Sequence, residues 1–292
     1  MSPPTTATET GNPGSVGAGG ADLRRVALVT GSSSGIGEAT ARLLAGRSDT
    51  SVVLVARREE RLRALADSLG HGASFIAVDL LEEDAPERVR RHLEEHHGRL
   101  DLLVNNAGAS WRARFGDGGY ANVRRTFAIN FDAQVRLTEA LLGLLRASAP
   151  SAVVNVASTA ARVARAGTGA YSASKAALAA WSDALALEER PHGVHVGLVL
   201  PGFISTEGFP QRELTQRGRT RWMVSTPERG AEAIVRAGFG GQAECYVPRP
   251  YRLVAVAAAV APGLVRRTLG GGGAQALTTV TGADLSDRAA GR

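Results

Sequence analysis

The chain carries almost no lysine. Of its 34 Lys+Arg residues, Lys175 is the single lysine, and arginine supplies all the other positive charges. Arginine is a planar, permanently charged fork, whereas lysine is a compact ammonium whose pKa its surroundings can shift. The scarcity therefore marks Lys175 as a position where a guanidinium cannot substitute, although one lysine could also persist by chance.

Cysteine is equally scarce. Cys245 stands alone, so the chain cannot form an internal disulfide, and we expect a reducing, cytoplasmic location. The six histidines show no metal-ligand spacing, and no serine lies in a nucleophile elbow. We therefore expect no metal site and find no support for a hydrolase.

Long hydrophobic runs are also missing. The apolar segment 253–261 ends at Pro262 and Gly263, far short of the ~20 residues of a membrane-spanning helix. It could be a docking helix, an oligomer contact or a membrane-surface helix with Arg266 and Arg267 at the headgroups. We favour a protein contact over a membrane contact.

What is present is typical of a globular protein: 292 residues, of which 44% are hydrophobic and 21% charged. The net charge of +6 suggests nucleic acid, anionic lipid or a phosphorylated ligand. The arginines are scattered or paired without a long basic run, so nucleic-acid binding is not expected. We expect a flexible arm at 1–22, one domain at 23–250, and an extension at 251–292 with a short apolar helix and a disordered tail.

Short apolar runs alternate with amphipathic, helix-length segments. Near-continuous Val/Leu strands separated by helices indicate a parallel sheet covered on both faces. We therefore predict an α/β fold, a Rossmann-type doubly wound parallel sheet of about seven strands in a single domain. The predicted strands are Val26–Val29, Val52–Val55, Phe75–Val78, Leu102–Val104, Val153–Val156, Val194–Val199 and Glu244–Val247, and the predicted helices are Glu38–Ala45, Glu59–Ser68, Pro86–His97, Val123–Leu145, Ser174–Glu189 and Glu228–Arg236.

A glycine-rich turn, Thr30–Gly37, follows the first strand and opens a helix. Glycines let the turn tighten and let the backbone approach a pyrophosphate, whose charge the helix N-terminus receives. Turns also use glycine for purely steric reasons. The strand–turn–helix placement favours dinucleotide binding.

Two arginines, Arg57 and Arg58, follow the second strand. An acidic residue there would bind the ribose hydroxyls of NAD, whereas an arginine accommodates the extra phosphate of NADP. A solvated helix start is the alternative, although cations are disfavoured there. Asp79 follows the third strand, where its carboxylate could accept a hydrogen bond from the adenine amino group or could simply form a turn. Asn105–Gly108 follow the fourth strand, where they could border a ligand or could simply form a turn.

Tyr171 precedes Lys175 by four residues. Positions i and i+4 share one face of a helix, so we expect the ammonium to lie beside the phenol. A nearby cation favours the phenolate and lowers the pKa of a tyrosine. The pair predicts an acid/base catalyst.

Together these residues resemble the short-chain dehydrogenase/reductase family, in its short single-domain branch, over about residues 22–250. The resemblance is carried by the Gly31–Gly37 turn, Asp79, Asn105–Gly108, Asn130, Ser158, Tyr171, Lys175 and Pro201-Gly202.

The resemblance implies a catalytic role for four side chains. Tyr171 would exchange the proton with the substrate oxygen, Lys175 would also hold the nicotinamide ribose, and Ser158 would donate to the carbonyl oxygen. Asn130 would support a proton-relay water, unless it is an ordinary helix-interior asparagine. The implied cofactor contacts are Gly31, Ser33, Ser34, Gly35, Ile36, Gly37, Arg57, Arg58, Asp79, Leu80, Asn106, Ala107, Gly108, Tyr171, Lys175, Pro201, Gly202, Ile204 and Thr206.

We therefore expect an NADP(H)-preferring oxidoreductase that interconverts a carbonyl and an alcohol, and a homo-oligomer, either dimer or tetramer. Aromatic residues in 109–115 and 203–223 suggest an apolar lid and a lipophilic substrate, or they are simply core residues. The alternatives are a catalytically silent NADP-binding sensor on the same fold and a membrane-surface structural protein using residues 250–267.

Overall fold

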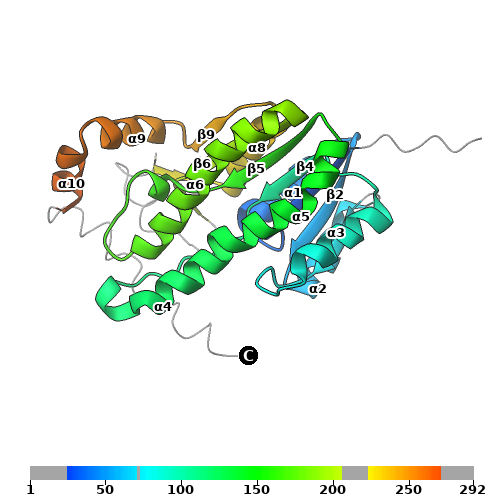
Figure 1. The fold of residues 1–292 in the computed structure, drawn as a ribbon, viewed down its shortest axis with the longest axis horizontal. Coiled ribbons are helices and arrows are strands. Elements are labelled where there is room, and N and C mark those ends of the chain that lie inside the picture. The colour runs from blue at the N-terminus through cyan, green and yellow to red at the C-terminus, as the bar shows by residue number, and fades with distance from the viewer. Residues whose placement is uncertain (1–24, 71–72, 206–222, 271–292) are drawn as a thin grey trace, which may run out of the picture.

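The fold is built on one parallel sheet. A computed structural model describes residues 25–70, 73–205 and 223–270. Seven strands pair in the order β3-β2-β1-β4-β5-β6-β9, and every pair is parallel. Figure 1 shows β2, β4, β5, β6 and β9 side by side in this sheet. They are β1 (Arg25–Thr30), β2 (Thr50–Ala56), β3 (Ala73–Ala77), β4 (Leu102–Asn105), β5 (Ser151–Val156), β6 (Val194–Pro201) and β9 (Glu244–Val247).

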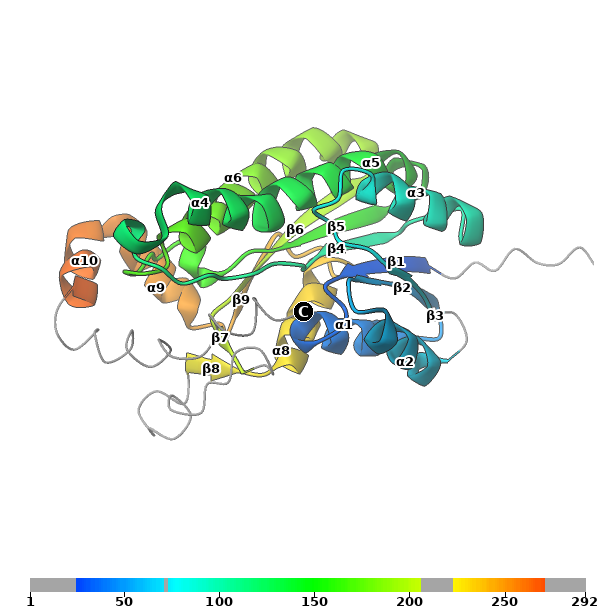
Figure 2. The same ribbon diagram turned by 90° about the horizontal axis from the view of Figure 1, so that it is seen from below.

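Helices cover both faces of this sheet, which confirms the predicted doubly wound fold (Figure 2). One face carries α1 (Gly35–Ala45), α2 (Glu59–Leu69) and α8 (Pro227–Ala237). The other face carries α3 (Ala85–His96), α4 (Phe115–Phe127), α5 (Ala133–Ala147) and α6 (Gly169–Glu189). Each predicted strand is present, and so is each predicted helix except Val123–Leu145, with ends shifted by a few residues.

The strands are apolar throughout because both of their faces are buried. Along β1, Ala27 and Val29 pack into the core under α1, α2 and α8, while Val26 and Leu28 pack into the core under α3 and α5. Successive side chains along the strand point to opposite faces of the sheet, and here each face is covered by a hydrophobic core rather than by water. All four of these side chains are at most 3% exposed.

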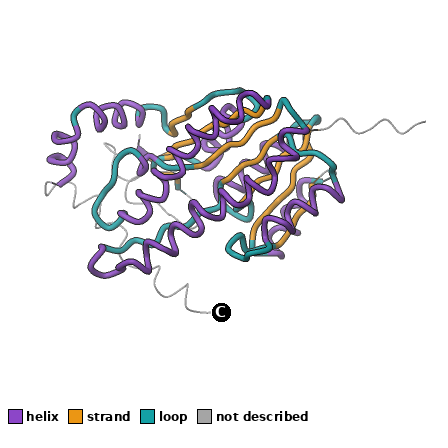
Figure 3. The backbone as a smooth tube through the Cα atoms, in the orientation of Figure 1, coloured by secondary structure: helices purple, strands orange, loops and turns teal. Residues whose placement is uncertain are grey.

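The predicted helix Val123–Leu145 is interrupted. The chain forms α4, then a π-helical turn at Ala128–Asp132, then α5, which follow one another in Figure 3. The π-helical turn places Asn130 in its middle, completely buried. Such turns insert an extra residue into a helix and are common at functional sites.

The C-terminal apolar segment forms α9 (Tyr251–Val260), which is followed by α10 (Pro262–Gly270). The predicted break at Pro262 is where a second helix begins, because proline fits a first helical position. Leu253, Val256 and Val260 of α9 are exposed. Among the described residues, none of the helices combines the length and the apolar character needed to cross a membrane.

Four predictions concern residues outside the described ranges: the arm at 1–22, the C-terminal tail beyond 270, the greater part of the lid segment 203–223, and Thr206. A small parallel pair, β7 (Phe203–Ile204) with β8 (Val224–Ser225), flanks that lid segment.

The turn between β1 and α1 is closed so tightly that it has no space for a side chain at Gly37. A Cβ built there would lie 2.3 Å from the carbonyl oxygen of Gly31 and 2.6 Å from Nδ2 of Asn106. Gly46, at the other end of the same helix, is its matched control, since its nearest neighbours would be 3.6 Å away and its φ is −67°.

Gly37→Ala is expected to lower the free energy of unfolding by about 2–3 kcal/mol, because backbone must move to admit the methyl group. Gly46→Ala is expected to change it by less than about 1 kcal/mol. Urea unfolding of both variants measures the difference, and equal small effects would show that the turn is looser than described.

Candidate active site

The site lies at the carboxyl ends of the central strands, where β1 is flanked by β2 on one side and β4 on the other. In an open α/β sheet the crossovers diverge at such a point and leave a crevice for ligands. The loops after β1, β2, β4, β5 and β6 all meet there.

The glycine-rich turn presents bare backbone to this crevice. Gly31 and Gly35 have φ angles of +65° and +60°, which favour glycine. Ser34 caps α1 without a side-chain hydrogen bond to the helix amides. The N-terminal amides are therefore left to donate to an anion, as expected for a turn that holds a pyrophosphate.

The turn is tied to the loop after β4. Thr30 Oγ1 accepts from the backbone amides of Asn106 and Ala107, both at 2.9 Å, and donates to the carbonyl of Val104 at 3.1 Å. Asn106 returns the contact by donating from Nδ2 to the carbonyl of Thr30 at 2.8 Å. Asn106 thus has a structural role in addition to any contact with a ligand.

Arg58 lies across the glycine-rich turn. Its guanidinium donates to Ser33 Oγ at 2.9 Å, to the Ser33 carbonyl at 3.1 Å and to Ser34 Oγ at 2.9 Å. Arg57 extends outward, 74% exposed, with NH1 3.6 Å from Oδ2 of Asp79. The two predicted phosphate-binding cations therefore flank the end of β2 on different sides.

Asp79 also serves its own turn, because Oδ1 accepts from the amide of Leu81 at 3.1 Å. The other carboxylate oxygen, Oδ2, faces Arg57 and takes no part in the turn. The predicted hydrogen bond from the adenine amino group to Asp79 remains a prediction. Leu80 is 6% exposed and packs in the core with Val78.

Lys175 is buried inside the protein, with 3% of its surface exposed. Nζ donates to the carbonyl of Val156 at 2.8 Å, the one hydrogen bond that it makes within the described ranges. Burial lowers the pKa of Lys175 to about 7. An ammonium has three donors, so this site leaves two for a ligand with hydroxyl oxygens.

Asn130 connects the loop after β4 to α6. Its amide exchanges two hydrogen bonds of 2.9 Å with the backbone of Ala109, and Nδ2 donates to Ser174 Oγ at 3.1 Å. A Cβ on Gly108 would lie 2.8 Å from Asn130 Oδ1 and 3.4 Å from Lys175 Nζ. Asn130 is thus not an ordinary helix-interior asparagine; its relay water remains a prediction.

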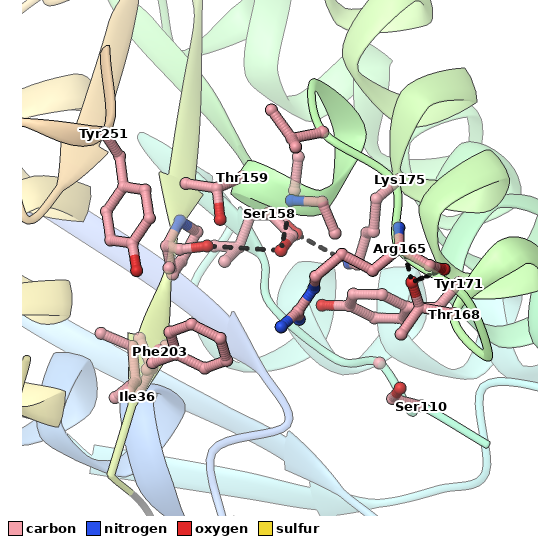
Figure 4. Close-up of a pocket in the computed structure, with 18 of the residues that line it drawn as sticks. Ile36, Ser110, Ser158, Thr159, Arg165, Thr168, Tyr171, Lys175, Phe203 and Tyr251 are labelled. Carbon is pink, nitrogen blue, oxygen red and sulfur yellow. Dashed lines mark hydrogen bonds between the residues drawn. The ribbon is translucent and has the colours of Figure 1, made fainter. Parts of the chain in front are cut away.

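Ser158 follows β5 and is 8% exposed. Its Oγ accepts from the amide of Ala160 at 3.1 Å and donates to the carbonyl of Pro201 at 3.3 Å. The second bond is long, so the hydroxyl can redirect its proton toward another oxygen in the crevice. Figure 4 shows this hydroxyl and the ring of Tyr171 in the same pocket.

Burial raises the pKa of Tyr171, whereas the nearby Ser158 hydroxyl and then Arg112 and Arg165 act to lower it. The described cations that act on this phenol are therefore two arginines, whereas the i,i+4 spacing predicts Lys175. Arg112 lies in the segment 109–115, which is predicted to contact the substrate. Arg165, in the loop after β5, is not among the predicted site residues, and no sequence motif marks it.

Nine of the predicted site residues line one cavity of about 550 Å³, whereas Asn130 and the predicted phosphate and adenine contacts lie outside its lining. Arg112, Arg165 and Thr168 contribute polar groups, and Val163 and Met223 contribute apolar surface. Those of the predicted residues that line it are Ile36, Asn106, Gly108, Ser158, Tyr171, Lys175, Pro201, Gly202 and Ile204.

The C-terminal extension also enters this cavity. Tyr251, Val254 and Ala255, all from α9, are part of its wall. The Tyr251 ring lies against Gly202 so closely that a Cβ there would be 2.4 Å from it, and the hydroxyl donates to the carbonyl of Met223 at 3.2 Å. The predicted domain ends at residue 250. The sequence predicts a short apolar helix beyond it but does not indicate that this helix lines the cavity.

Comparisons with known proteins agree with this geometry. A family model described as short chain dehydrogenase matches residues 25–217. A cis-4-hydroxycyclohexanecarboxylate dehydrogenase from Sinomonas cyclohexanicum is 34% identical over 224 residues, which cover 74% of this chain and 90% of the relative. The 3-oxoacyl-(acyl-carrier-protein) reductase FabG of Vibrio cholerae is 32% identical over 206 residues, which cover 70% of this chain and 82% of that protein.

Among solved structures, an RhlG/NADP active-site complex from Pseudomonas aeruginosa aligns with a TM-score of 0.68 at 30% identity, over 76% of this chain and 94% of that one. The family match covers well over half of the chain, and the sheet order and crevice agree with it. The chain belongs to the short-chain dehydrogenase/reductase family of NAD(P)-binding oxidoreductases.

Proposed function

We propose that this protein is an NADP(H)-dependent oxidoreductase that interconverts a carbonyl and an alcohol, with Tyr171 as the general acid and base. The observation that carries the proposal is the shared cavity, in which Tyr171, Ser158 and Lys175 meet at the end of β5. Carbonyl and alcohol interconversion is the general chemistry of the family to which the chain belongs.

The residues present fit a dinucleotide. The glycine-rich turn offers uncapped helix amides for the pyrophosphate, and Lys175 has donors to spare for ribose hydroxyls. Gly202 and Ile204 border the cavity where the nicotinamide would lie. When bound, the cofactor supplies the hydride, and the protein supplies position, exclusion of water and the proton.

The preference for the phosphorylated cofactor rests on the end of β2. No carboxylate follows this strand until Glu59, and Arg57 and Arg58 stand where an acidic residue would bind the free ribose hydroxyls. Arg58 already draws Ser33 and Ser34 together, so a phosphate there would meet a guanidinium and two hydroxyls. The similar Pseudomonas aeruginosa protein was solved as a complex with NADP, which supports this assignment.

The proton chemistry follows from the burial of Tyr171. Because burial raises the pKa of its phenol, the protonated form dominates near neutral pH, which is the form needed to protonate a carbonyl oxygen during reduction. Ser158 would donate a second hydrogen bond to that oxygen as negative charge develops on it. The reverse reaction needs the phenolate, so alcohol oxidation is favoured at higher pH.

The substrate is not fixed by the relatives. One acts on a ring alcohol that carries a carboxylate, another on a 3-oxoacyl group on a carrier protein. The predicted lipophilic substrate agrees with Val163, Met223 and Val254 in the cavity wall.

A homo-oligomer remains a prediction. The second candidate function is a catalytically silent NADP-binding sensor, which would bind the cofactor without turning over a substrate.

Arg57→Ala and Arg58→Ala are each expected to weaken NADPH binding about tenfold or more, because each removes a charged contact with the phosphate. NADH binding should change less than about threefold. Fluorescence titration of both cofactors measures this, and Arg63→Ala, an exposed arginine of α2 paired with Glu59, serves as the control. Equal losses for NADPH and NADH would contradict the phosphate role.

Tyr171→Phe is expected to lower kcat by about 1000-fold, since the ring remains while the proton donor is lost. NADPH should still bind, which a cofactor titration of the same preparation checks. Tyr120→Phe, at a tyrosine of α4 that is 69% exposed, is the matched control with expected full activity. Substantial carbonyl reduction by the Tyr171 variant would remove this residue from the reaction.

A further inference from the structure

Two arginines from distant parts of the chain lie beside the reacting phenol. Arg112 belongs to the loop after β4 and Arg165 to the loop after β5, and both line the cavity with Tyr171. Figure 4 shows the guanidinium of Arg165 extending next to the Tyr171 hydroxyl. Both cations act on that phenol, as their effect on its pKa indicates.

Arg165 is held in place by an aromatic ring rather than by an acid. Its guanidinium carbon lies 4.8 Å from the centroid of the Phe203 ring. No carboxylate lies within ion-pair distance of Arg165 in the parts of the chain that the structure describes. Stacking fixes the plane of a guanidinium while its N–H edge stays available to a ligand.

The two guanidiniums are an unfavourable pair. Burial lowers the pKa of both, and each lies close enough to the other for Arg165 to lower the pKa of Arg112 further. Arginine nevertheless stays charged, because its pKa starts far above neutrality. A cavity that brings two partly buried like charges together is suited to an anion, which would offset both the desolvation and the repulsion.

We propose that Arg112 and Arg165 bind a carboxylate of the substrate, next to the carbonyl that is reduced. This inference rests on the proposed function, because it assigns a second group to the same substrate. A planar carboxylate matches the fork of a guanidinium in two parallel hydrogen bonds. It would also neutralise the repulsion between the arginines when the substrate binds.

The rest of the cavity wall indicates what the remaining part of the substrate is like. Val163, Met223 and Val254, together with the ring of Tyr251, give the same cavity an apolar surface. The substrate class is therefore a keto acid or hydroxy acid with a hydrophobic body, rather than a neutral lipophilic ketone. The carboxylate lies on the side of the loops after β4 and β5, and the apolar part lies toward α9.

The test is a homologous series of straight-chain methyl ketones ending in a carboxylate, each paired with its primary amide. The series is needed because it finds the spacing between ketone and carboxylate that the cavity accepts. The amide keeps the shape and polarity of the acid but has no charge. With NADPH, kcat/KM for the best acid should exceed that for its amide about tenfold or more, mainly through KM.

Arg165→Met should reduce this ratio of acid to amide to about one, because methionine keeps much of the length but has no charge. Arg165→Lys should restore part of the preference, which a purely structural role would not predict. Arg91→Met, at an exposed arginine of α3 outside the cavity, controls for net charge and should leave the ratio unchanged.

Calorimetry gives a readout without turnover. Cyclohexanecarboxylate and cyclohexanecarboxamide are titrated into the full-length protein, with and without NADP+, and only the carboxylate should bind measurably, with binding lost in the Arg165→Met variant. A phosphate monoester that binds better than any carboxylate would overturn the choice of anion. Equal kcat/KM for acids and amides, or a preference that survives Arg165→Met, would overturn the site.

The two hypotheses fail separately. If neutral ketones are reduced but the acid gains nothing, the proposed function stands and the carboxylate site is wrong. If no ketone in the series is reduced but the carboxylate still binds through Arg165, the anion site stands and the carbonyl reductase assignment is wrong.

Discussion

The active site depends on one buried cation. Lys175 is the single lysine of the chain, it is almost fully enclosed, and within the described ranges it meets one acceptor, the carbonyl of Val156. Keeping an ammonium in such a place costs free energy, and the depression of its pKa to about 7 reflects that cost. Under the proposed function, a bound ligand with hydroxyl oxygens would complete the hydrogen bonds of this ammonium and offset the cost.

The surrounding structure is arranged around that position. Gly108 has no side chain, which leaves room for both Lys175 and Asn130. Asn130 in turn sits on a π-helical turn that directs its amide toward the loop after β4 and toward Ser174, one turn of α6 from Tyr171. A loop, a helix interruption and a catalytic helix are therefore linked by a single side chain, which suggests that Asn130 acts first as a positioning residue.

Much of the fold could be predicted because its signals are local. The strands are continuous apolar runs bounded by turn residues, and the glycine-rich turn has a fixed place between a strand and a helix. Ser158, Tyr171 and Lys175 likewise meet in one cavity. The π-helical turn at Asn130 could not be predicted, because its residues continue an ordinary helical pattern.

Interactions between distant segments are harder to foresee. Arg112 and Arg165 act on Tyr171 from two different loops, and no spacing in the sequence links them. The same holds for Tyr251, which lies against Gly202 from a helix beyond the predicted end of the domain. The i,i+4 spacing predicts that the Lys175 ammonium lies beside the Tyr171 phenol and lowers its pKa. Both residues do line one cavity, but the cations that act on the pKa of the phenol are Arg112 and Arg165. Under the two proposals, the cationic side chains have different ligands: Lys175 binds the cofactor, whereas Arg112 and Arg165 bind the substrate.

The pKa of Lys175 tests this division most directly, and the chain makes the measurement simple because lysine labelled with 15N gives one side-chain signal. NMR titration of the cofactor-free protein should show a pKa of about 7, far below the ordinary value of 10.5. NADP+ should raise it, since ribose hydroxyls accept from the charged form and the phosphates add negative charge. A pKa near 10.5 in the free protein, or one that NADP+ leaves unchanged, would contradict the account.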